Sequence, residues 1–101
     1  MTAKDIENIL KNNGFIIAPP ERLLPFSAKV KLSRKSYINI GAGFAGVKAF
    51  DIALVAKSEE EAESVSDRAV NAIRNAGVIL VDADTHFEGR TAVLTVTIKE
   101  V

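Results

Sequence analysis

Apolar and polar residues alternate in several stretches of the chain, and a period of two indicates strands with one buried face. The alternation starts at Ser27 and resumes at 37–40 after a polar turn at 33–36. Two alternating segments joined by a turn predict a β-hairpin. The apolar run 15–17 indicates a short strand before it, and a pair of prolines then predicts that 18–26 form a loop.

The second half of the chain predicts another hairpin. An apolar run opens a strand at Val78, and alternation returns from Val93 to Ile98. Between them, Glu88 and Gly89 have the composition of a two-residue turn. We therefore expect a long C-terminal hairpin.

Two other stretches show the three- and four-residue spacing of amphipathic helices. Thr2 can cap the first helix with Asp5 as its capping-box partner, and Gly14 stops it. Ser58 can cap the second helix, which Gly77 closes. The apolar positions of this second helix are Ala62, Val65, Ala69, Ile73 and Ala76.

Length and composition limit the fold class. The chain has 101 residues, 48% of them hydrophobic and 26% charged, which fits one globular domain over 1–101. The predicted elements give an α+β fold with two helices packed on a mixed or antiparallel sheet. With no cysteine and a single histidine, the chain cannot form a disulfide, a thiolate metal site or a multi-histidine zinc site.

Gly41, Gly43 and Gly46 have the G-x-G-x-x-G spacing of dinucleotide-binding folds. That fingerprint requires a helix at its last glycines. A helix over 47–57 would bury the carboxylate of Asp51 on its apolar face, whereas a strand keeps the charged residues of this segment at its ends. We therefore expect an extended segment here, no NAD or FAD, and no other cofactor.

The segment 41–46 is then a flexible bend between two strands. Phe44, at its tip, can be tucked under the loop or offered to a partner, and the packed arrangement is favoured.

Charge is unevenly distributed, although the net charge is zero. Residues 1–50 hold eight Lys/Arg and three Asp/Glu, whereas residues 51–101 hold five and ten. The basic residues that we expect at one interface, together with the 41–46 loop, are Lys29, Lys31, Arg34, Lys35 and Lys48. The acidic residues of the complementary interface are Glu59, Glu60, Glu61, Glu63 and Asp67.

Each charged group also has a plainer interpretation. Lysines on an edge strand discourage unwanted pairing, and acids at a helix start stabilise the helix dipole. Together, however, opposite charges on different faces let copies of one subunit associate head to tail, and such contacts can close into a ring. We therefore expect the chain to bind itself.

Candidate catalytic residues are few. His86 lies near Asp84 and Glu88 in the predicted hairpin, but a solvated histidine is the favoured interpretation. Asp82 and Asp84 point the same way on a strand, which could suit a cation, but they have no further ligands. We expect no enzyme activity. The basic patch could meet phosphates, but a pI near 6.6 disfavours nucleic acid as a partner.

The order of the elements carries a family resemblance. A Gly/Ala loop and a strand lead into KSEEEAESVSDRAVNAIRNAG, and VILVDADTHFEGRTAVLTVTIKEV follows. In size and element order the chain resembles the tail terminator proteins of long-tailed bacteriophages. The resemblance implies an α+β virion protein that forms a hexameric ring, stops growth of the tail tube and joins tail to head. Its partners would be itself and other tail or head-tail connector proteins.

The sequence thus predicts an oligomeric structural protein. The alternative is a small nucleic-acid- or ligand-binding regulatory domain of α+β type. Because the charged N-terminus lacks a signal-peptide core and no run is long enough to span a bilayer, we expect a soluble protein with no membrane partner. Its location would be the virion after assembly in the host cytoplasm, or otherwise the cytoplasm.

Overall fold

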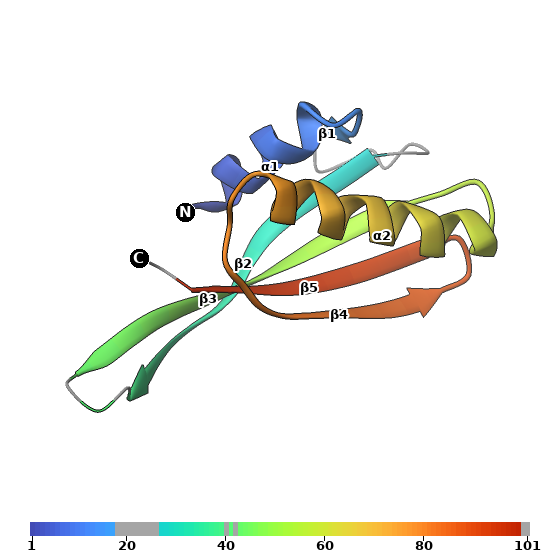
Figure 1. Ribbon diagram of the computed structural model, residues 1–101. Coiled ribbons are helices and arrows are strands. Elements are labelled where there is room, and N and C mark those ends of the chain that lie inside the picture. Colours follow the sequence, from blue (N-terminus) through green and yellow to red (C-terminus); the bar gives the residue numbers. More distant parts are fainter. Residues whose placement is uncertain (18–26, 40, 42, 100–101) are drawn as a thin grey trace.

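The computed structural model describes residues 1–17, 27–39, 41 and 43–99 (Figure 1). In chain order its elements are α1 (Ala3–Lys11), β1 (Ile16–Ile17), β2 (Ser27–Asn39), β3 (Phe44–Val55), α2 (Glu59–Asn75), β4 (Leu80–Glu88) and β5 (Thr91–Lys99). The α+β class is confirmed. The loop predicted for 18–26 lies outside the described residues.

The five strands form one mixed sheet in the order β1-β2-β3-β5-β4. Only β1 and β2 are parallel, whereas β2 with β3, β3 with β5 and β5 with β4 are antiparallel. The hairpins β2–β3 and β4–β5 therefore sit side by side through β3 and β5. Only the second is a hairpin predicted from sequence, because the first was placed within 27–40, of which 27–39 form the single strand β2. The second starts slightly later than predicted, since β4 begins at Leu80 rather than Val78.

Both helices cover the same face of this sheet (Figure 1). The alternation of the strands puts one set of side chains under the helices and leaves the other set on an uncovered face. The largest fully buried apolar side chains, from both helices and from β3 and β5, are Phe50, Ile6, Leu10, Ile52, Leu54, Ile73, Leu94, Ile98, Val65 and Val96. We call the uncovered side the open face.

The predicted helix caps are present. Thr2 and Asp5 form a reciprocal capping box at α1. The Thr2 backbone N–H donates to the Asp5 carboxylate at 2.7 Å and holds the pKa of that carboxyl below its usual value. At α2, the Ser58 hydroxyl accepts from the Glu61 backbone N–H at 3.2 Å, while Glu61 itself accepts from the Lys57 backbone N–H at 2.8 Å.

The turn predicted at 33–36 is wrong, because β2 runs without interruption from Ser27 to Asn39. A bulge between Leu32 and Arg34 inserts one extra residue, Ser33, against β3. The polar residues were mistaken for a turn. They are polar because this part of the strand is exposed. The bulge accounts for the interruption in the alternation of apolar and polar residues.

Replacing Ser58 with alanine is expected to destabilise the protein by about 1 kcal/mol, because the α2 N-terminus loses its side-chain acceptor. Urea unfolding measures this as a lower midpoint with an unchanged slope. Ser64→Ala, at an exposed position of the same helix, is the matched control and should cause no loss. Equal losses in the two variants would contradict the capping role.

Candidate assembly interface

A two-stranded arm, formed by residues 37–39 of β2 and 44–46 of β3, projects from the sheet. β5 pairs with β3 from Val55 to Val47, so among the described residues the segment Phe44–Gly46 pairs with β2 alone. The arm extends beyond the helices and gives the molecule extents of 47 × 25 × 22 Å (Figure 1). A two-stranded ribbon has little stability of its own, so the arm is a candidate contact surface.

The glycine motif lies at the end of this arm. Gly41 has a φ of +88° and donates its N–H to the Asn39 side chain at 2.9 Å, as expected in a tight turn. The chain then continues as β3, which confirms the extended segment predicted after the motif, although Ala56 and Lys57 lie beyond the strand. The predicted loop 41–46 was too long, since Phe44 to Gly46 already belong to β3. The strand-to-helix turn that would hold a pyrophosphate is replaced by an antiparallel hairpin.

Asp51 shows how the extended chain accommodates its carboxylate. It lies on the open face, where its Oδ1 accepts from the Thr95 hydroxyl across the β3–β5 ladder at 2.8 Å. A helix would have placed this carboxylate in the core. The charge was predicted at a strand end, but β3 runs from Phe44 to Val55, so Asp51 lies within the strand and is accommodated by its hydrogen bond on the open face.

The arm carries two exposed aromatic side chains near its tip. Phe44 is 72% exposed and Tyr37 is 65% exposed, and together they line a shallow recess. The Lys35 ammonium lies 5.5 Å from the centre of the Tyr37 ring, at cation–π distance. The favoured prediction that Phe44 packs under its loop is therefore wrong. Neither α1 nor α2 reaches this end of the sheet in the part of the chain that the structure describes (Figure 1).

The predicted basic residues fall on both faces of the sheet. Lys29, Lys31 and Arg34 project from β2 onto the open face, where they pair in register with Ala53, Asp51 and Ala49. The bulge puts Lys35 and Lys48, which pair with each other, on the opposite face. There the Lys48 ammonium donates to the Met1 carbonyl at 3.0 Å.

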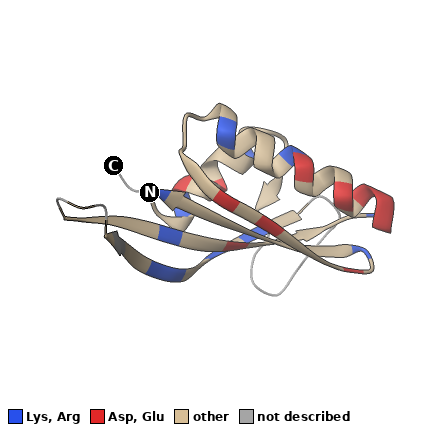
Figure 2. Cartoon of the chain, turned by 60° about the horizontal axis from the view of Figure 1, so that its bottom comes forward, with Lys and Arg blue, Asp and Glu red and all other residues tan. Residues whose placement is uncertain are grey.

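The predicted acidic residues are on α2, at the opposite end of the molecule from the arm (Figure 2). Glu61 is half-buried and its carboxylate accepts from the Lys57 backbone N–H just before the helix, whereas Glu59, Glu60, Glu63 and Asp67 are exposed. One acidic side chain at the start of α2 is therefore hydrogen-bonded within the chain, and the others are exposed to solvent.

A second group of acidic residues lies on the sheet, and the sequence alone did not show how it is placed relative to the basic residues. Asp82, Asp84 and Glu88 lie on the open face of β4, at the edge of the sheet opposite β2 (Figure 2). Their alternate spacing was visible, and Asp82 and Asp84 do point the same way as predicted. Their relation to Lys29 and Lys31 depends on the strand order, which the spacing does not contain.

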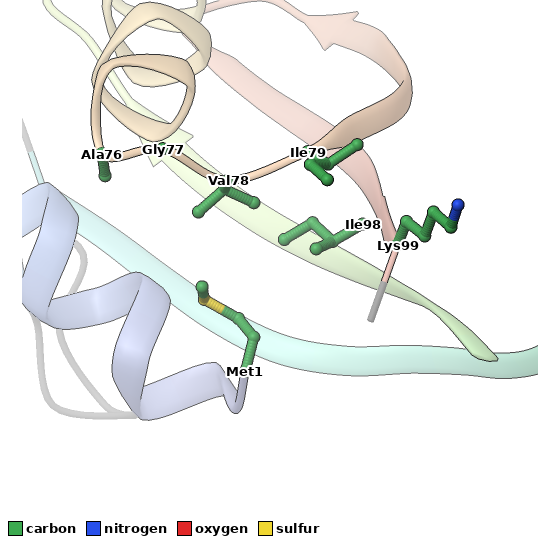
Figure 3. A pocket seen from close by; sticks show the side chains of 7 residues that line it. All are labelled: Met1, Ala76, Gly77, Val78, Ile79, Ile98 and Lys99. Atoms are coloured by element: carbon green, nitrogen blue, oxygen red, sulfur yellow. The ribbon is translucent and has the colours of Figure 1, made fainter. Parts of the chain in front are cut away.

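The candidate catalytic and cation-binding residues of the sequence, Asp82, Asp84 and His86, lie on the open face of β4. His86 is exposed on the open face beside Val93. Within the described residues, no three His, Cys, Asp or Glu side chains gather closely enough to hold a metal ion. A pocket of about 440 Å³ lies between Met1, the α2–β4 connection and the end of β5. The described residues that line it carry apolar side chains, apart from Gly77 and Lys99 (Figure 3).

No family model, curated protein or solved structure matches this chain. The described residues include no helix that is both long and apolar enough to cross a bilayer. The features of the molecule that bear on its function are the arm, the open face and the two charged sides of the sheet.

Proposed function

We propose that this chain is a non-enzymatic structural protein that assembles with copies of itself. The observation that carries the proposal is the projecting arm, whose Tyr37 and Phe44 side chains are exposed at its tip. Aromatic residues of this kind are typical anchors of protein interfaces.

The arrangement of charge supports the same function. The open face is basic along β2 and acidic along β4, and α2 begins with further exposed acids (Figure 2). A subunit with opposite charges on opposite sides attracts copies of itself in one orientation. Contacts of this head-to-tail type close into rings when the rotation between subunits permits.

We propose further that the assembly is of the phage tail terminator type. Support comes from the resemblance in size and element order and from the α+β fold with its long hairpin. The partners would then be copies of the chain in a hexameric ring, together with tail or head-tail connector proteins. Assembly would take place in the host cytoplasm and end in the virion.

The test is the molar mass of the purified protein, measured by light scattering at low and high salt over a range of concentrations. We expect an oligomer at low salt that dissociates as salt screens the charged contacts. Negative-stain images of the low-salt sample should show rings. A monomer under all of these conditions would overturn the proposal.

A further inference from the structure

We propose that subunits join edge to edge, with β2 of one copy pairing antiparallel to β4 of the next, so that the sheet continues from subunit to subunit. The occupant of each edge is a second copy of this chain. The inference rests on the proposed self-assembly and specifies the contact that produces it.

Both edges have backbone available for pairing. Among the described residues, β1 pairs with β2 only at Ser27 and Ala28, which leaves Lys29–Asn39. On the other side, β4 is the last strand of the sheet over its full length, Leu80–Glu88. Edge strands of this length present rows of N–H and C=O groups that template further pairing.

Strand direction favours this junction. Because β2, β3, β5 and β4 alternate in direction across the sheet, β4 is antiparallel to β2 of its own chain. A neighbour in the same orientation therefore brings its β4 antiparallel to β2, with the helices of both copies on one side. The contact uses two different edges, so it leaves a free edge at each end and can propagate.

Charge selects the pairing of unlike edges. With Lys29 opposite Glu88 of the next copy, the β2 bulge brings Arg34 opposite Asp84, and both pairs lie on the open face. Opposite charges across a ladder stabilise pairing, and like charges oppose it. Pairing of two β2 edges or of two β4 edges would bring like charges together, so pairing between identical edges is disfavoured.

The helix side of the junction is apolar. Leu32 on β2 is 50% exposed and Phe87 on β4 is 45% exposed, and both face the helix-covered side from the sheet edges. In the same register Phe87 lies opposite Val30 and diagonal to Leu32, within reach of an aromatic ring. Pairing would therefore cover exposed apolar surface on one side while it joins charges on the other.

Cysteine cross-linking tests the junction directly, because the chain has no native cysteine. Lys29→Cys and Glu88→Cys are placed in one chain and oxidised at low salt. Residues opposite each other on antiparallel strands are within disulfide range, so we expect a covalent ladder of dimers, trimers and longer species. Within one chain the two strands are three spacings apart, about 14 Å, which is too far for a disulfide.

Each single-cysteine variant is the control and should give no ladder, because it places no second thiol at the junction. A 1:1 mixture of the two single variants should give dimers. If light scattering shows oligomers but the double variant forms no ladder, the edge-pairing inference is overturned and self-assembly stands. If the protein is monomeric throughout, both proposals fail.

Charge reversal gives an independent readout. Lys29→Glu with Arg34→Glu makes both edges acidic, and Asp84→Lys with Glu88→Lys makes both edges basic. Each variant alone should assemble at least roughly tenfold more weakly, whereas an equal mixture should recover assembly because unlike edges are available again. The matched control, Lys4→Glu with Lys11→Glu, makes the same change of charge at exposed positions of α1 and should assemble. Failure of the mixture to recover while single variants remain folded would count against the junction.

Discussion

Replacing Phe50 with alanine is expected to lower the free energy of unfolding by about 3 to 5 kcal/mol, the range for a fully buried aromatic residue. Phe50 is 1% exposed and lies in the centre of β3, between Leu32 of β2 and Val96 of β5, on the face that the helices cover. The truncation removes a large apolar contact and leaves a cavity. Since small domains are stable by only about 5 to 15 kcal/mol, the loss is a large fraction of the total.

Urea unfolding followed by circular dichroism measures the effect. The matched control is Phe44→Ala, which removes the same atoms from the exposed arm and should change stability by less than about 0.5 kcal/mol. A loss below about 1 kcal/mol for Phe50→Ala would contradict the packing of the helices on this face of the sheet.

The second large effect is expected in assembly rather than in stability. Changing both Tyr37 and Phe44 to serine should raise the dissociation constant of the oligomer by roughly 30-fold or more, because truncating an interface anchor removes about 2 kcal/mol or more of binding. Both side chains are exposed, so the fold itself should be retained. Sedimentation equilibrium of variant and parent measures the change.

Val93→Ser is the control for the loss of exposed apolar surface. Val93 lies on the open face of β5, an interior strand outside the arm, and is 39% exposed. Its replacement should leave the dissociation constant unchanged. If the arm variant assembles as tightly as the parent, the arm is not an assembly contact.

The helices could be predicted closely from sequence. Thr2 with Asp5, and Ser58 at the start of α2, act through hydrogen bonds to residues three positions away, so a local pattern contains the whole interaction. The extended segment after the glycines could be predicted equally well, since a helix would have buried Asp51. These inferences needed no knowledge of strand order.

The errors came from the arm and from the part of β2 that leads into it. Polar residues at 33–36 were taken as a turn because a bulged, solvated strand and a turn have similar local composition. Phe44 was assigned to a packed loop because an aromatic residue usually finds cover within its own chain. Its exposure follows from the lengths of β2 and β3 relative to β5, which are set by pairing between distant segments.

The sequence by itself determined the fold class, the caps of both helices, the alternating faces of the strands and the polarity of charge along the chain. Only the tertiary structure decided that β4 and the part of β2 beyond Ala28 form opposite edges, that their charges are opposite in sign, and that the arm projects with its aromatic residues uncovered. The physical reason is the separation along the sequence of the residues that interact. Caps and faces depend on residues two to four positions apart, whereas strand order depends on which distant segments bury their apolar sides together.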